Sequence, residues 1–184
     1  LEHRWLYKLR QTVQFSTYIE PIGKAKILCQ GSDVTIVAVA EMVLEALRAA
    51  KRLAEVGVQA EVIDLVSVHP IDYETIGKSI AKTNHLIIAD VSTPEFSVCS
   101  EVSAVIQERH EADLDATPSR VTCHSTPCPT APSLSAEYYP TDNDILSAAI
   151  LQLPQLSKHN LCVKWRTFQE LHLPPTDNID DLLT

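Results

Sequence analysis

Residues 33–90 alternate between short apolar runs and segments in which hydrophobic positions follow a helical period. The run at 33–40, DVTIVAVA, is nearly continuous in apolar and β-branched residues, which is typical of a strand buried on both faces of a parallel sheet. Residues 41–57 then show an apolar stripe opposite a face that carries Glu41, Glu45, Arg48, Lys51, Arg52 and Glu55. Apolar runs at 60–68 and 85–90 predict two more strands. The pattern predicts an α/β domain with right-handed crossovers.

Shorter patterned segments lie on both sides of this unit. Residues 23–33 predict a short strand closed by a tight turn, which would pair antiparallel at the edge of the sheet. Between the second and third buried strands, Asp72 is expected to cap a helix. Further along, the pattern predicts a helix at about 97–110, a short last strand at 119–123, a stiff irregular loop with four prolines at 124–140, and a final helix capped by Thr141 or Asp142.

Composition narrows the functional classes. The chain has 15 Lys and Arg against 24 Asp and Glu, a net charge of −9 without a basic cluster, which argues against binding to nucleic acid or to an anionic membrane. Its four glycines are well separated, so neither a GxGxxG turn nor a P-loop is present. Five scattered cysteines favour a reducing compartment. The only methionine, Met42, lies inside a helical segment, and we expect the chain to be a piece of a longer polypeptide.

Two strand ends carry candidate ligand-binding groups. His69 follows the second buried strand and Asp90 ends the third, so both are expected at the carboxyl edge, where open α/β sheets bind ligands. A pocket there could also include the hydroxyl groups of Ser92 and Thr93. The structural alternatives are that His69 is a partly exposed loop residue and that Asp90 forms a turn or cap. We favour the structural interpretation of both residues.

Other polar clusters predict no independent active site. Cys123, His124 and Cys128 resemble a zinc-binding cluster, but no second ligand pair at suitable spacing exists, and His159 and Cys162 are isolated. We expect no metal site. Glu101 and Glu108 are seven residues apart on the third helix and are interpreted as part of its solvated face. No nucleophile-elbow glycine is present, so hydrolase chemistry has no support.

Seven segments together carry a family resemblance that covers residues 1 to about 150. In order they are LEHRWLY, PIGKAKI, GSDVTIVA, EVIDL, HPIDYETIGKSIAKTNHL, SEVSAVIQE and LDATPSRVT, the last followed by the proline-rich loop. The chain resembles the C-terminal domain of the beta subunit of thiamine-diphosphate-dependent 2-oxoacid dehydrogenases of the pyruvate and branched-chain type. The resemblance implies a three-layer α/β/α fold with a five-stranded, mostly parallel sheet and one antiparallel edge strand. It also implies three parts: the end of a pyrimidine-binding domain and linker at 1–22, this domain at 23–153, and an extension at 154–184.

The same resemblance implies an assembling role rather than a catalytic one. Thiamine diphosphate and magnesium would be bound by the full-length assembly outside this chain, and the isolated domain would be inactive. The expected partners are a second beta subunit, the alpha subunit and the dihydrolipoyl acyltransferase core, in the bacterial cytoplasm or the mitochondrial matrix. The candidate loop and partner-contact residues are His69, Asp90, Phe96, Glu101, Pro127, Pro129 and Tyr139.

The chain also departs from the family pattern. Family glycines are replaced in the loop after the third strand, VSTPEFSVCS, and in the segment Cys123, His124 and Ser125, so both loops are expected to be reshaped. Two alternatives remain: the equivalent domain of a transketolase or deoxyxylulose-phosphate synthase, and a non-catalytic interaction module with this fold. The segments LEHRWLY and PIGKAK favour the dehydrogenase.

Overall fold

The computed structural model describes residues 6–7, 9–10, 12, 19–153 and 156. Its centre is a five-stranded sheet in the order β1-β3-β2-β4-β5. The strands are β1 (Lys26–Cys29), β2 (Val34–Ala38), β3 (Ala60–Asp64), β4 (Leu86–Ala89) and β5 (Ser119–Val121). Strands β2, β3, β4 and β5 are parallel, and β1 pairs antiparallel with β3. The prediction of a mostly parallel sheet with one antiparallel edge strand is confirmed.

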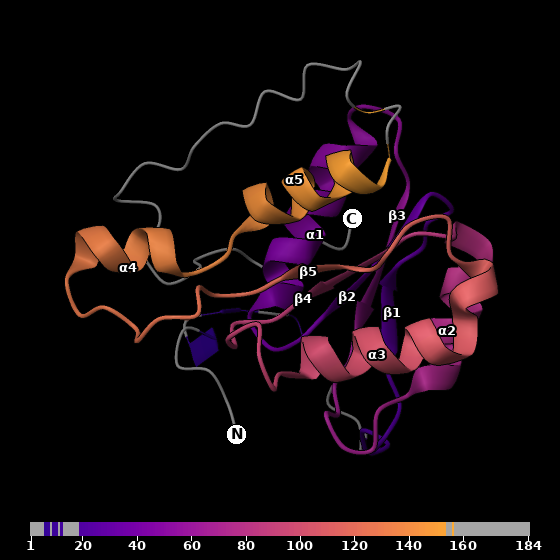
Figure 1. Ribbon diagram of the computed structural model, residues 1–184, viewed down its shortest axis with the longest axis horizontal. Coiled ribbons are helices and arrows are strands. Elements are labelled where there is room, and N and C mark those ends of the chain that lie inside the picture. Colours follow the sequence, from indigo (N-terminus) through magenta and orange to yellow (C-terminus); the bar gives the residue numbers. More distant parts are fainter. Residues whose placement is uncertain (1–5, 8, 11, 13–18, 154–155, 157–184) are drawn as a thin grey trace.

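Helices cover both faces of the sheet (Figure 1). One face carries α1 (Met42–Ala54) and α5 (Asp142–Gln152), and the other carries α2 (Tyr73–Thr83) and α3 (Val98–His110), which is followed by a 3-10 turn, η2 (Glu111–Asp113). Each face has its own hydrophobic cluster, because β2, β3 and β4 present apolar side chains on both sides. The expected three-layer α/β/α architecture is therefore confirmed.

Local sequence signals explain most of the element boundaries. Asp72 caps α2 as expected: its carboxylate accepts hydrogen bonds from Thr75 N at 3.2 Å and from Ala25 N at 3.2 Å, so the cap also fixes the entry to β1. Burial alone would raise the pKa of Asp72, but the hydrogen bonds from Thr75 and Ala25 hold it below its usual value. At the start of α5, Thr141 and Asp144 form a capping box.

Four details differ from the sequence predictions. A tight turn leads from β1 to β2, yet β1 pairs with β3 rather than with β2. The proline-rich segment is not wholly irregular, because it contains the short helix α4 (Pro132–Tyr138), which begins with a proline at a position where helices tolerate one. The segment LEHRWLY has a strand-like pattern, yet its residues 6 and 7 belong to a 3-10 turn. Strand β5 ends two residues earlier than expected.

Some predictions concern residues outside the described part of the chain. Most of the extension at 154–184 lies there, including His159 and Cys162. Within the described residues, no helix combines the length and apolar character that crossing a bilayer requires.

Candidate functional site

The carboxyl edge of the parallel strands is where the fold gathers its unusual polar groups. Strand β2 leads through α1 to β3 on one side, whereas β4 leads through α3 to β5 on the other. Strands β2 and β4 are neighbours in the sheet, and the connections that follow them run in opposite directions. In open α/β sheets such a switch point is the usual place for a ligand. The loops that surround this point include the segment at 39–41, the segment at 90–97, and the chain that follows β5.

Two buried carboxylates lie at the switch point, one after each diverging strand. Glu41 is 6% exposed and Asp90 is 7% exposed. Burial, together with the negative charges of Glu45 and Asp90, raises the pKa of Glu41 to about 7. Asp90 accepts a hydrogen bond from the hydroxyl group of Ser92, two residues along the chain. Glu41 is thus a group that exchanges a proton near neutral pH inside the fold.

Thiol and phenol groups from the chain after β5 extend this cluster. Cys123 is buried and donates to the carbonyl oxygen of Val91 at 3.2 Å. Burial, together with the charges of Glu41 and Asp90, raises the pKa of Cys123 to about 12. Its thiol is therefore protonated at neutral pH and is a poor nucleophile.

The Sγ atom of Cys128, five residues later, lies 3.3 Å from the hydroxyl oxygen of Tyr139. The hydrogen bond with Cys128 raises the pKa of Tyr139, and burial of the phenol raises it as well. The ring of Tyr139 also packs edge-to-face on the ring of Tyr138, with 5.1 Å between the ring centroids. Among the described residues, no three His, Cys, Asp or Glu side chains are arranged to hold a metal ion. These thiol and phenol groups thus join two parts of the proline-rich segment to each other.

The loop after β4 is held in one shape by hydrogen bonds. The carbonyl oxygen of Pro94 accepts from Arg120 at 2.9 Å and from the Ser100 hydroxyl group at 2.6 Å. The carboxylate of Glu95 accepts from Ser125 at 2.9 Å. Within this loop Phe96 is fully exposed and has a left-handed backbone, with φ +54°. The loop therefore presents an aromatic side chain to solvent on a fixed backbone.

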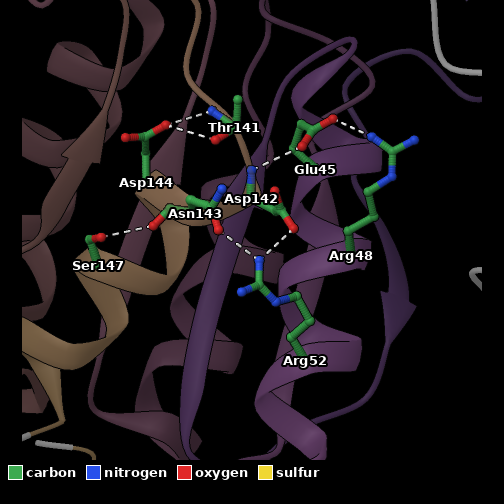
Figure 2. Close-up of polar contacts among 8 residues, drawn as sticks. All are labelled: Glu45, Arg48, Arg52, Thr141, Asp142, Asn143, Asp144 and Ser147. Carbon is green, nitrogen blue, oxygen red and sulfur yellow. Dashed lines mark hydrogen bonds and ion pairs between the residues drawn. The ribbon is translucent and has the colours of Figure 1, made fainter. Parts of the chain in front are cut away.

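The segment 124–140, which we call the arm, is fixed where it joins α5. Figure 2 shows Arg52 on α1 donating to Asp142 Oδ2 at 2.9 Å and to Asn143 Oδ1 at 2.8 Å. Glu45, which pairs with Arg48, accepts from the Asp142 amide at 2.9 Å. Asp142 and Asn143 are buried, so these bonds join α1 and α5 away from bulk water. Since Ser125 bonds Glu95 at the other end, the arm is anchored at both ends while α4 lies apart from the helix layers (Figure 1).

Replacing Arg52 by methionine is expected to lower the free energy of unfolding by about 2 kcal/mol, because two buried oxygen acceptors lose a charged donor. Urea unfolding followed by circular dichroism measures this loss. The matched control is Lys78→Met, which breaks the exposed Lys78–Glu74 pair on α2 and should leave stability nearly unchanged, because water screens that pair. Equal losses in the two variants would show that the Arg52 contacts do not join α1 to α5 as described.

The predicted candidates are partly brought together. Asp90 accepts from Ser92 two residues along the chain, whereas His69 is exposed in the loop after β3 and makes no hydrogen bond to Asp90 in the described structure. Glu101 and Glu108 are exposed on α3, in agreement with the solvated-face interpretation. In the arm, Pro127 is exposed, and Pro129 and Tyr139 are partly buried.

Sequence reasoning was wrong about Glu41. The helical period assigned it to the solvent face of α1, whereas it precedes that helix and is buried beside Asp90. A signal was present in the sequence: Glu41 comes directly after a fully buried strand, at the same edge as Asp90. Arg52 was likewise assigned to solvent, although its guanidinium joins two helices.

Comparisons with known proteins identify relatives of this fold. The sequence profile of the family described as "Transketolase, C-terminal domain" matches residues 23–145. The beta subunit of acetoin:2,6-dichlorophenolindophenol oxidoreductase from Bacillus subtilis is 38% identical over 149 residues, which cover 81% of this chain and 44% of that protein. The mitochondrial pyruvate dehydrogenase E1 component subunit beta-1 from Arabidopsis thaliana is 42% identical over 134 residues, which cover 73% of this chain and 37% of that protein.

A solved structure agrees with these matches. It is titled as a split gene transketolase, an inactive beta4 tetramer, and it superimposes with a TM-score of 0.66 at 30% identity. The superposition covers 73% of this chain and 44% of that one. The chain thus spans less than half the length of these relatives.

Proposed function

This chain belongs to the transketolase C-terminal domain family, and from that membership we propose that it is the C-terminal domain of the beta subunit of a thiamine-diphosphate-dependent 2-oxoacid dehydrogenase. The observation that carries the proposal is the match to beta subunits over 73–81% of the chain, at 38–42% identity. The full-length enzyme would oxidatively decarboxylate pyruvate or a branched-chain 2-oxoacid.

Within that enzyme we assign the domain to assembly rather than to chemistry. The polar groups at the carboxyl edge support this role, because Glu41, Asp90 and Cys123 are all buried, Asp90 accepts from Ser92 in its own loop, and Cys123 donates to Val91 of that loop. The most exposed large hydrophobic side chain at the same edge is that of Phe96. Such a surface suits contact with another protein better than contact with a small polar substrate.

The described residues do not fit a magnesium diphosphate. Glu41 and Asp90 are buried, and no glycine-rich turn is present to approach phosphate groups. We therefore propose that thiamine diphosphate and magnesium bind elsewhere in the assembly. The proposed partners are a second beta subunit, an alpha subunit and the dihydrolipoyl acyltransferase core. The corresponding compartments are the bacterial cytoplasm and the mitochondrial matrix.

Two alternative functions each rest on a specific match. The identity with the acetoin oxidoreductase subunit favours acetoin as an alternative substrate of the same kind of enzyme. The superposition on a split gene transketolase favours a transketolase component, which would transfer a ketol group between sugar phosphates. Both alternatives retain a beta-type subunit and differ in what the full enzyme consumes.

The decisive experiment combines the full-length polypeptide that contains this chain with its alpha subunit, thiamine diphosphate and magnesium. Reduction of dichlorophenolindophenol is then measured with pyruvate, with 3-methyl-2-oxobutanoate and with acetoin. We expect dye reduction with one of the two 2-oxoacids and none with residues 1–184 alone. Reduction of the dye with acetoin alone would identify acetoin, rather than a 2-oxoacid, as the substrate. Transfer of a ketol group without reduction of the dye would support the transketolase instead.

A further inference from the structure

Phe96 is the most exposed large hydrophobic residue in the described part of the chain. Its side chain is 105% exposed, compared with 84% for Ile22 and 80% for Leu151. Its backbone has φ +54°, a conformation that costs a residue with a β-carbon about 1 kcal/mol or more. Exposure and backbone strain both oppose folding stability, so neither explains why a phenylalanine stands at this position. Strained residues of this kind are concentrated where a protein binds something.

The loop at 91–97 is fixed before any partner arrives. Pro94 is held by Arg120 and Ser100, and the Glu95 carbonyl oxygen accepts from the Thr93 hydroxyl group at 3.3 Å. Ser97 then caps α3 through Ser100 N at 3.2 Å. Because the backbone on both sides of Phe96 is bonded, little conformational entropy would be lost when the ring is buried. This preorganisation is a property of aromatic anchors in protein interfaces.

Carboxylate side chains outnumber cationic ones beside Phe96. Glu95 precedes it and Glu101 lies in the first turn of the helix that begins two residues later, and both side chains are exposed. The nearby cation, Arg120, donates to Pro94 O and to Ser100 Oγ, so it is engaged with the loop itself. The complementary surface would therefore offer an apolar pocket bordered by lysine or arginine side chains.

A second copy of this chain fits that description poorly. In a two-fold contact centred on Phe96, the same surface patch would face itself and bring the carboxylates of both copies together. Like charges that face each other across an interface oppose association. A different polypeptide avoids this repulsion.

We propose that Phe96 anchors this domain to a different polypeptide, inserting into an apolar pocket bordered by basic side chains. The inference rests on the proposed function, in which this different polypeptide is the alpha subunit. Val66 and Val68, which are 43% and 53% exposed after β3, extend the apolar area along the same carboxyl edge.

The test measures binding of the full-length polypeptide to the purified alpha subunit by surface plasmon resonance. Phe96→Ala is expected to raise the dissociation constant about 30-fold or more, as the loss of a central aromatic anchor does. Leu151→Ala, which removes another exposed apolar side chain on α5, should leave it unchanged. Replacing Glu95 and Glu101 together by glutamine should slow association and reduce its dependence on salt.

A further variant separates binding from folding. Phe96→Gly removes the ring and also relieves the left-handed backbone, so its melting temperature should equal or exceed that of the unaltered protein while binding is lost. Unchanged affinity of Phe96→Ala for the alpha subunit would overturn the inference, and so would a loss confined to self-association of the beta subunit. If the unaltered polypeptide neither binds the alpha subunit nor turns over any of the three substrates, the proposed function fails and the inference falls with it.

Discussion

Replacing Gly31 by alanine is expected to reduce the free energy of unfolding by about 3 kcal/mol. A β-carbon on Gly31 would overlap the backbone of Ala60 and Glu61 and lie 2.5 Å from the carbonyl oxygen of Gln59. These are backbone atoms of β3 and its entry, and β3 is hydrogen-bonded to both β1 and β2. No side-chain rotation can relieve the overlap, so the turn between β1 and β2 must move away from the sheet.

The matched control for this prediction is Gly57→Ala. Gly57 has φ +83° and its β-carbon would meet no atom within 4 Å, so only the backbone conformation is penalised, by about 1 kcal/mol. Urea titration of both variants, with the slope of the unfolding free energy compared as well as the midpoint, distinguishes the two causes. If the two substitutions cost the same, close approach of the turn to β3 is not what requires glycine at position 31.

Replacing Glu41 by glutamine is expected to stabilise the protein at pH 8 by up to about 3 kcal/mol relative to its effect at pH 4. The pKa of Glu41 is raised from 4.5 to about 7 by burial and by Glu45 and Asp90. The folded state therefore holds this proton more tightly than the unfolded state. The favourable contribution is complete below pH 4.5 and is lost as the pH rises through 7, where the folded chain must bury a negative charge. Glutamine carries no charge to bury.

The measurement is the difference in unfolding free energy between the variant and the unaltered protein across pH 4 to 8. Burial would raise the pKa of Glu61, but hydrogen bonds from Lys82 and Ser79 lower it, so the stability that Glu61 contributes is lost as the pH falls through that lowered value. Because Glu61 is present in both proteins, its contribution cancels in the difference. Glu55→Gln, which replaces an exposed carboxylate at the end of α1, is the control for the loss of one negative charge. A difference that stays constant over this range contradicts the prediction.

The spacing of hydrophobic residues was sufficient to predict the regular strands and helices. Buried strands appear as continuous apolar runs, and amphipathic helices appear as apolar stripes with a helical period. Strand β2 is buried at every position, and the apolar stripe of α1 was read correctly except at its margins. The pairing of β1 with β3 was harder to predict, since a turn suggests pairing between the strands it joins. Helix α4 was missed because four prolines in 17 residues outweighed a seven-residue helical pattern.

The candidate site was predictable only in part, for a related reason. The order of strands in the sheet decides which loops meet, and a single sequence does not contain that order explicitly. Asp90 was placed at the correct edge, but its buried neighbour Glu41 was not, because helical period says nothing about the residue that precedes the helix. Phe96 could be named as a loop residue, whereas its full exposure and left-handed backbone depend on bonds from Arg120 and Ser100.

The uneven environments of the cysteines have a practical consequence. Burial raises the pKa of Cys99 and Cys123 to about 12 and also raises that of the partly buried Cys29, whereas Cys128 is exposed on the arm. A maleimide dye should therefore label Cys128 ahead of the other described thiols, once Cys162 has been replaced by serine. A fluorophore there would stand beside Tyr139 on the segment that projects from the domain (Figure 1). The arm thus offers a built-in attachment point from which assembly can be followed by changes in dye anisotropy.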